Sequence, residues 1–213
     1  MIRRLLSNTA VACFMCWALL ANNASATYQV GKDYDILPSP IMTQTGDKIE
    51  VLEIFWYGCS HCYRFEQYLA KWKTTLAKDV AFVMMPADWG GAMGIHARAF
   101  YTAEALAVID TLHPIIFKAI HEQKQRLHTE KSIKQLFVSH GVSAQDFDGI
   151  FTSFGVDAQV SLAKKRMNDY RIQGTPELII NGRYRISSTK AGSLENMLKI
   201  AEYLIQQERA QFL

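Results

Sequence analysis

The feature that most constrains the fold is a nearly continuous apolar run, IEVLEIFWY at residues 49–57, which Gly58 ends. A run of this kind is typical of a central strand buried on both faces of a sheet. A helix with one apolar face is predicted directly after it. The residues of this face are Cys62, Phe65, Leu69, Trp72 and Leu76. Residues 80–85 predict a second strand, which Pro86 stops, and the three elements together make a βαβ unit.

The rest of the chain divides into an arm, a helical block and a second mixed unit. Residues 27–48 form the arm, which prolines and a Thr-Gly-Asp turn interrupt. Trp89-Gly90-Gly91 is predicted to be a joint, and from there to about Tyr170 every pattern is helical. Within this block, Gly141 and Gly155 are expected to end helices.

The second mixed unit begins after Gly174-Thr175-Pro176, which breaks the last helix of the block. Asn181-Gly182 lies between two short β-prone runs, which is a strong signal for a hairpin. An amphipathic helix then closes the chain over residues 194–205. The sequence therefore predicts an α/β protein in which a βαβ and a ββα unit bracket a block of helices.

The first 26 residues have the layout of a secretory signal peptide. Arg3 and Arg4 precede a mostly apolar stretch, Leu5 to Leu20, and Ala24-Ser25-Ala26 supplies a small-residue cleavage signal. The stretch is shorter than the roughly 20 apolar residues that span a bilayer. We expect cleavage after Ala26, although an uncleaved N-terminal anchor is an alternative.

Composition narrows the class of partner. Cleavage removes two of the 23 basic residues and none of the 20 acidic ones, which leaves 21 basic against 20 acidic. A balance this even argues against nucleic acid and against a strongly charged partner. No second apolar stretch is long enough to cross a membrane.

Two of the four cysteines fall in the predicted signal peptide, so the exported chain keeps Cys59 and Cys62. A bridge between them closes a very short loop and adds little entropic stability. Zinc is disfavoured because this pair supplies two of the four ligands and no second close Cys/His pair exists. Haem attachment is disfavoured because it requires a histidine directly after the second cysteine, and Tyr63 is at that position. A redox role is favoured over a purely structural bridge.

The predicted position of the pair gives its two sulfurs different environments. Cys59 directly precedes a helix, where unpaired backbone N–H groups and the positive end of the helix dipole stabilise a thiolate. His61 can add a donor or a positive charge. Cys62 lies on the apolar face of the same helix and is expected to be shielded. A stabilised Cys59 thiolate leaves readily and makes the Cys59–Cys62 disulfide more oxidising.

The sequence resembles the DsbA family of bacterial periplasmic oxidases, within the thioredoxin-like superfamily. The likeness rests on VLEIFWYGCSHCYRFE (51–66), Gly174-Thr175-Pro176, LIINGRY (178–184) and the helical block between them. The resemblance implies a thioredoxin-like fold with an inserted helical domain. Residues 27–88 and 160–213 would form the thioredoxin-like domain, and residues 89–159 the insertion.

The resemblance also implies roles for single residues. Cys59 would be the nucleophile and Cys62 its resolving partner, joined as a disulfide in the oxidised form. Thr175-Pro176 would be the substrate-binding loop opposite the thiols, with a cis bond before Pro176; an ordinary trans proline is the alternative. The chain has Ser60 where the commonest family motif has Pro, and residues at this position tune the redox potential.

Glu53 shares a strand face with Val51 and Phe55, where an acidic group is costly unless paired and its pKa should rise. It resembles the family's buried acid beneath the active-site helix, which would make it a proton relay for Cys62. The next strand has Val83-Met84-Met85, with no base to partner it. The alternative is a glutamate that reaches water or a distant lysine.

Three functions remain open from the sequence. The first is a periplasmic oxidase that introduces disulfides into newly exported proteins. The second is a reductase or isomerase of the same fold, although the arm leaves no room for the dimerisation domain that isomerases usually need. The third is a peptide-binding holdase. The resemblance implies a membrane quinone-linked, DsbB-like re-oxidase as partner, and we expect a monomer without a metal or cofactor.

The remaining histidines are predicted to be surface or packing residues.

Overall fold

The computed structural model describes residues 27–211. The predicted signal peptide, with its cleavage point after Ala26, lies outside the described residues. The strands are β1 (Asp35–Ile36), β2 (Ile49–Phe55), β3 (Val80–Pro86), β4 (Glu177–Ile180) and β5 (Tyr184–Ser187). The helices are α1 (Ser60–Lys73), α2 (Ala92–Ala105), α3 (Ile109–His121), α4 (Glu130–Ser139), α5 (Ala144–Phe151), α6 (Phe154–Asp169), α7 (Ser188–Ala191) and α8 (Leu194–Gln211).

The five strands form one mixed sheet in the order β1-β5-β4-β2-β3. The apolar run predicted to be a central strand is β2, and all seven of its residues are buried. It pairs in parallel with β3 and antiparallel with β4. Parallel pairing to β3 through α1 confirms the predicted βαβ unit, and antiparallel pairing of β4 with β5 confirms the predicted hairpin.

The hairpin turn requires its sequence. Asn181 and Gly182 both have positive φ, at 48° and 63°, as the tightest hairpin turns demand. A Cβ added at Gly182 would lie 1.9 Å from the carbonyl oxygen of Ile41. The Ile41 backbone N–H donates to the Gly182 carbonyl at 2.9 Å. The arm therefore packs against the turn at a point that admits no side chain.

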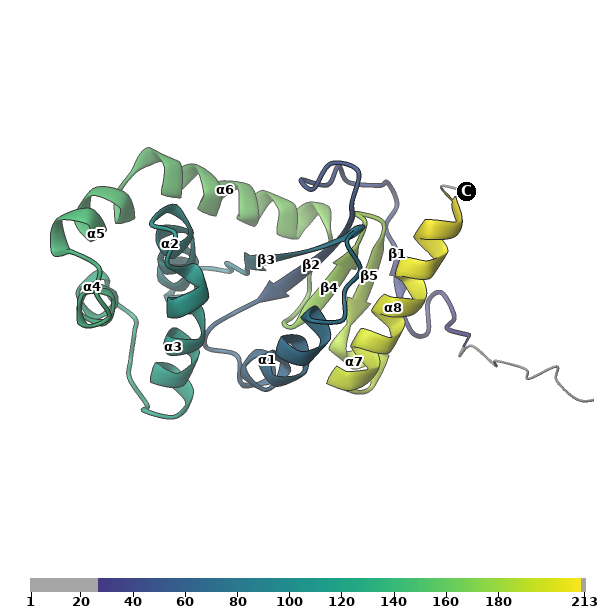
Figure 1. Ribbon diagram of the computed structural model, residues 1–213, viewed down its shortest axis with the longest axis horizontal. Helices are drawn as coiled ribbons and strands as arrows, with labels where there is room; N and C mark the ends of the chain where they lie inside the picture. The colour runs from purple at the N-terminus through teal and green to yellow at the C-terminus, as the bar shows by residue number, and fades with distance from the viewer. Residues whose placement is uncertain (1–26, 212–213) are drawn as a thin grey trace, which may run out of the picture.

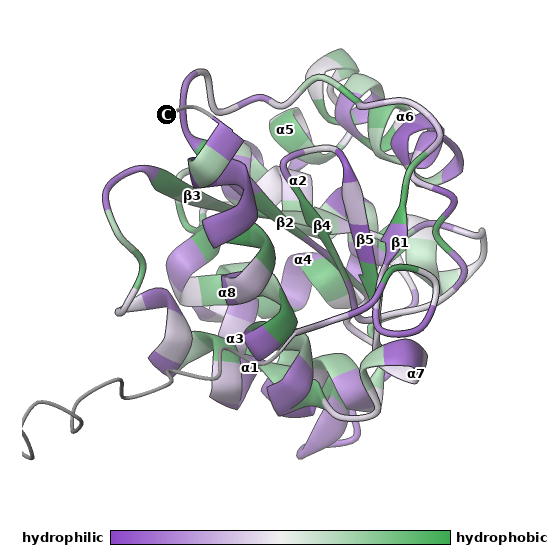
Figure 2. Ribbon diagram, turned by 90° about the vertical axis from the view of Figure 1, so that its right-hand side faces the viewer, coloured by the Kyte–Doolittle hydropathy of each residue, from purple (hydrophilic) through white to green (hydrophobic). Residues whose placement is uncertain are grey.

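Two helical layers cover the sheet. Val51 and Leu178 face α1 and α8, in a core that includes Phe65, Leu69 and Met197. Leu52 and Ile54 face the opposite way, into a larger core shared with α2, α3 and α6. Figure 1 shows α2 to α5 grouped at one end of the molecule and α8 at the other, with α6 running back toward the sheet. In Figure 2 the strands β2 and β4 are hydrophobic, whereas α8 and α6 carry hydrophilic residues along their lengths.

The helical block predicted between Gly91 and Tyr170 is confirmed as α2 to α6. Gly141 follows the end of α4 with φ of 93°, as expected of a helix stop. The prediction for Gly155 is wrong, because Gly155 lies in the first turn of α6. Ser153 caps this helix by accepting from the Val156 N–H. A serine N-cap favours the start of a helix, even with a glycine two residues later. The predicted domain boundary at residues 159/160 falls inside α6, which continues unbroken to Asp169.

Candidate active site

The first turn of α1 holds the Cys-x-x-Cys motif at the end of the central strand. After β2 the chain turns through Trp56 to Gly58, and a Cβ on Gly58 would lie 2.3 Å from the Trp56 ring. Cys59 has extended backbone angles and is the N-cap residue of α1. Its sulfur accepts from the Cys62 backbone N–H at 3.4 Å. The sequence therefore places one sulfur at the helix terminus, as predicted.

Cys59 is a partly exposed free thiol whose surroundings favour its ionised form. A hydrogen bond from the Cys62 side chain is the largest cause, and it helps to lower the Cys59 pKa from 9.0 to about 5. Burial opposes this effect, while the Thr175 side chain and the backbone N–H groups of Cys62 and His61 reinforce it. In the protonated form the thiol also donates to the Thr175 carbonyl at 3.4 Å, which favours the thiol. The donors outweigh this contact.

Cys62 has the opposite environment on the same helix. Its side chain is fully buried among the residues of the predicted apolar face. Burial raises its pKa well above 9.0, and the neighbouring Cys59 and Glu53 raise it further. The predicted asymmetry of exposure is confirmed: one sulfur is accessible and acidic, and the other is buried and weakly acidic.

The two residues between the cysteines are exposed. The Cys59 sulfur is stabilised by the backbone N–H of His61 rather than by its ring. No hydrogen bond joins the imidazole of His61 or the hydroxyl of Ser60 to the Cys59 sulfur in the part of the chain that the structure describes. The expected contribution of a histidine side chain is therefore replaced by a main-chain contribution.

The loop predicted to face the thiols does so. The peptide bond between Thr175 and Pro176 is cis. The Thr175 carbonyl lies against the Cys59 sulfur although the two residues are 116 positions apart in the chain. Pro176 is buried, while Thr175 is half-buried.

Glu53 is completely buried in β2, on the sheet face that α1 covers. Its register partner on β3 is Met84, so the strand that could carry a lysine offers a thioether instead. Neither carboxyl oxygen has a hydrogen-bond partner among residues 27–211. Burial raises its pKa well above 4.5, and Glu66 and Cys59 raise it further, while Lys73 at the far end of α1 lowers it.

A second buried polar cluster lies beside the motif and was not predicted from the sequence. His113 on α3 pairs through Nδ1 with the Tyr57 hydroxyl at 2.9 Å. Its Nε2 lies 3.4 Å from Glu66 Oε1 on α1. The sequence predicts a surface or packing residue at His113, and its burial agrees with the packing alternative, whereas its polar partners were not predicted. The apolar face of α3 indicated that this position is buried, but its partners are distant in sequence and gave no signal.

His96 is buried as a packing residue. Its Nδ1 accepts from the Trp56 indole at 3.0 Å, and its Nε2 contacts the Leu127 carbonyl at 3.0 Å. Burial lowers its pKa to about 4. Among residues 27–211, no group of three or more His, Cys, Asp or Glu side chains is arranged to hold a metal ion.

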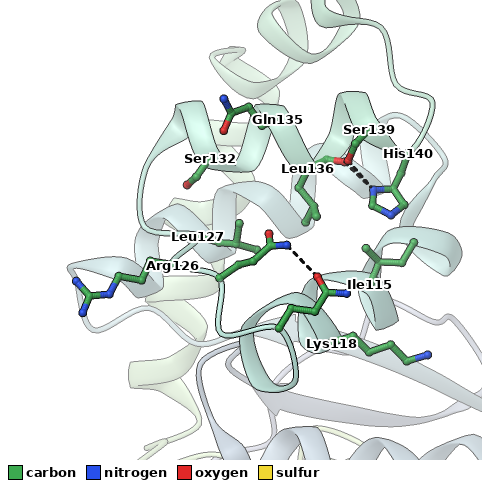
Figure 3. A pocket seen from close by; sticks show the side chains of 11 residues that line it. Ile115, Lys118, Arg126, Leu127, Ser132, Gln135, Leu136, Ser139 and His140 are labelled. Atoms are coloured by element: carbon green, nitrogen blue, oxygen red, sulfur yellow. Dashed lines mark hydrogen bonds between the residues drawn. The ribbon is translucent and has the colours of Figure 1, made fainter.

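A hollow of about 320 Å³ lies between α3 and α4, away from the cysteines. Its lining includes Lys118, Arg126, Ser139 and His140, and Figure 3 shows that Lys118 and Arg126 point in different directions rather than toward a common point. None of its lining residues belongs to the motif or to the cis-proline loop. The partly exposed Cys59 sulfur instead lies beside the cis-proline loop, outside this hollow.

Comparisons with known proteins agree with this geometry. Residues 95–200 match the model of a DSBA-like thioredoxin domain. The chain is 39% identical over 183 residues to the thiol:disulfide interchange protein DsbA of Pseudomonas aeruginosa, covering 86% of this chain and 87% of that protein. It is 40% identical to DsbA of Azotobacter vinelandii, with 87% and 86% covered. This chain belongs to the DsbA family.

Solved DsbA structures have the same fold. The crystal structure of Pseudomonas aeruginosa DsbA superposes with a TM-score of 0.83 at 39% identity, covering 86% of this chain and 96% of that one. DsbA from Xylella fastidiosa gives 0.81 at 33% identity, with 86% and 98% covered. The thioredoxin-like fold with inserted helices is therefore confirmed, and the protein is a thiol:disulfide oxidoreductase of the DsbA family.

Proposed function

We propose that Cys59 and Cys62 form the redox-active disulfide of this enzyme and that it oxidises paired cysteines in newly exported proteins. The observation that carries the proposal is the asymmetry of the pair. Cys59 is accessible with a pKa lowered to about 5, whereas Cys62 is buried with a raised pKa. An accessible, acidic sulfur is the one that an incoming thiolate attacks and the one that later leaves.

The reaction proceeds in two exchanges. A substrate thiolate attacks Cys59 Sγ of the disulfide, and the Cys59–Cys62 bond breaks as a bond to the substrate sulfur forms. Cys62 leaves as a thiolate and takes up a proton. A second substrate thiolate then attacks the substrate sulfur of the mixed disulfide, and Cys59 leaves as a thiolate. The substrate loses two electrons to form its disulfide, and the enzyme pair gains them.

The direction of the exchange follows from the reduced form. Donors from Cys62, Thr175 and the helix N-terminus stabilise the Cys59 thiolate. Whatever stabilises the reduced form makes the disulfide a stronger oxidant. We therefore infer net oxidation of substrates rather than reduction or isomerisation.

The cis-proline loop is proposed to bind the substrate backbone. Thr175 lies beside the Cys59 sulfur and is partly exposed. An extended peptide placed along this loop would bring its thiol to Cys59. Contacts made through main-chain groups of this loop would make recognition depend little on the substrate sequence.

Glu53 is proposed to relay the proton that Cys62 takes up and gives back. It is buried under α1, its carboxyl oxygens have no partners in the described chain, and it is electrostatically linked to both Cys59 and Cys62. The test is the Glu53→Gln variant, which keeps the shape and removes the proton. An unchanged pH profile of oxidation together with unchanged Cys62 reactivity would rule the relay out.

The periplasm is the proposed compartment, because the sequence has a signal-peptide layout and DsbA relatives are named as thiol:disulfide interchange proteins. Substrates would be exported proteins with free thiols, and a membrane quinone-linked, DsbB-like partner would re-oxidise the pair. The enzyme would act as a monomer without a cofactor. Over residues 27–211, no helix has the length and apolar character needed to cross a membrane.

The deciding experiment is the equilibrium of the cysteine pair against a glutathione series, combined with oxidation of a peptide that carries two cysteines. A potential in the range of strong oxidants supports the proposal, and one near that of a cytosolic reductant contradicts it. Cys59→Ser should abolish peptide oxidation. Cys62→Ser should accumulate a mixed disulfide when offered a substrate disulfide, because Cys59 remains available to attack. Biological activity retained in Cys59→Ala would favour a holdase.

A further inference from the structure

Glu177 is a buried carboxylate directly after the cis-proline loop, at the first position of β4. Its side chain is 2% exposed, and the three strand residues that follow it are apolar and buried. A carboxylate at such a position is costly unless it makes compensating contacts. An aliphatic side chain would pack at this position without the cost of burying a charge, so the contacts that Glu177 makes indicate its role.

One carboxyl oxygen of Glu177 folds back over the loop. Glu177 Oε1 accepts from the backbone N–H of Gln173 at 3.3 Å and from that of Gly174 at 3.2 Å. These two residues directly precede Thr175, whose carbonyl lies 3.4 Å from the Cys59 sulfur. The carboxylate therefore fixes the backbone directly before Thr175, the residue that faces the Cys59 sulfur.

The other carboxyl oxygen faces Arg185 on the neighbouring strand β5. Glu177 Oε2 lies 3.5 Å from Arg185 Nε, with both side chains at most one-tenth exposed. The same guanidinium donates to the Arg171 carbonyl, at the entry to the loop. It also pairs with Asp35 on β1 at 3.3 Å. Arg185 thus ties the loop's two sides, through Glu177 and Arg171, to the sheet.

We propose that Glu177, held by Arg185, is a positioning residue that fixes the cis-proline loop against Cys59. It touches neither thiol. Its effect on chemistry is transmitted through the backbone of residues 173–175, which sets where the Thr175 carbonyl and hydroxyl stand relative to the sulfur. The inference rests on the proposed role of this loop in binding substrate and stabilising the Cys59 thiolate.

The chain supplies a matched control. Glu208 on α8 is 1% exposed and, like Glu177, accepts hydrogen bonds at the base of a loop, here from Asn181 and Arg183 at the hairpin turn. Removing either carboxylate leaves donors unpaired and destabilises the fold. Removal of Glu177 should also change the chemistry, whereas removal of Glu208 should not.

The test compares Glu177→Ala, Glu177→Gln and Glu208→Ala in the full exported chain. For Glu177→Ala we expect KM for a two-cysteine peptide to rise about threefold to tenfold, because small misplacements of binding groups have effects at least this large. The Cys59 pKa, followed by thiolate absorbance, should rise from about 5. Glu177→Gln keeps an acceptor oxygen for the two N–H groups but loses the ion pair with Arg185, so its KM should lie between those of the wild type and Glu177→Ala. Glu208→Ala should lose stability with KM and the Cys59 pKa unchanged.

Two outcomes would overturn the inference: Glu177→Ala that loses stability but leaves both KM and the thiolate titration unchanged, or Glu208→Ala that shifts them equally. If Glu177→Ala does not fold, Arg185→Lys takes its place; it keeps the charge, loses the planar fork and should shift both quantities in the same direction, and unchanged values would contradict the inference. A different result would overturn the proposed function and leave the positioning role intact. In that case the wild-type protein fails to oxidise the peptide, but Glu177→Ala still shifts the Cys59 pKa.

Discussion

His113 Nε2 on α3 lies 3.4 Å from Glu66 Oε1 on α1, and the opposite ring nitrogen lies 2.9 Å from the Tyr57 hydroxyl. The imidazole therefore joins three segments: the end of the central strand, the helix that carries the cysteines and the helical block. Both His113 and Tyr57 are buried, so the pairing takes place away from water. Glu66 also raises the pKa of Glu53, which connects this cluster to the acid beneath the active site.

Replacing His113 by leucine should destabilise the reduced protein by about 1–3 kcal/mol, because the buried Tyr57 hydroxyl would lose its hydrogen-bond partner. Urea unfolding at neutral pH measures this loss. His128 is exposed, and His128→Gln should stay within about 0.5 kcal/mol of wild type. Equal effects of the two variants would show that the cluster does not stabilise the fold.

Alkylation of the reduced protein should report the lowered Cys59 pKa directly. The rate constant should rise with pH, reach half its maximum at about pH 5 and stay level through neutrality, because the thiolate is the reacting form. The Cys62→Ala variant lacks the largest stabilising donor and should move the midpoint to higher pH. A wild-type midpoint near the unperturbed value of 9.0 would contradict the assignment.

Glu53 should make stability depend on pH in a specific direction. Its folded-state pKa is raised, so the folded protein binds a proton that the unfolded chain releases above about pH 4.5. The resulting destabilisation is absent below that pH, grows as pH rises toward the folded pKa, and is constant above it. Glu53→Gln should therefore gain about 1–2 kcal/mol near neutral pH and less near pH 4.

The control for this pH dependence is Glu195→Gln on α8, where the side chain is 63% exposed and pairs with Lys199. It should show little change at either pH. A Glu53→Gln gain that is the same at both pH values would mean that burial of the charge is not its cause.

The cap of α1 gives a prediction that separates the two usual replacements of the first cysteine. Serine can accept from the Cys62 N–H as the sulfur does, whereas alanine cannot. Cys59→Ala should be less stable than Cys59→Ser by about 0.5–2 kcal/mol in thermal or urea unfolding. Ser143→Ala removes the cap of α5, where Ser143 accepts from the Asp146 N–H, and provides a reference for the size of the loss. Identical stabilities of the Cys59 variants would contradict a capping role.

Local patterns predicted most of the fold. The apolar run in β2, the apolar face of α1 and Asn181-Gly182 each encode their structure within a few residues, so strand, helix and hairpin follow from sequence order. The burial of Cys62 and Glu53 follows for the same reason, since each sits on a face whose neighbours are apolar. The prediction that Gly155 ends a helix was wrong because the preceding cap residue, Ser153, rather than the glycine, determines where α6 begins.

The contacts that tune the site were not accessible in this way. Glu177 lies at the junction of a turn signal and an apolar run, and no local pattern indicates that its carboxylate bends back over the loop. Glu66 stands off the apolar face of α1, and its partner His113 is 47 positions away. Such pairs depend on how helices from the inserted block pack on α1, which periodicity does not specify.

The Cys59 sulfur, which changes bonding partners in the proposed catalytic cycle, is also the N-cap acceptor of α1. As a thiolate it is a strong acceptor for the first-turn N–H groups; once bonded to Cys62 it is a neutral, weak acceptor. Each oxidation therefore withdraws a hydrogen-bond acceptor from the helix, and each reduction restores it. The first turn of α1 is therefore expected to be less stable in the oxidised protein than in the reduced protein.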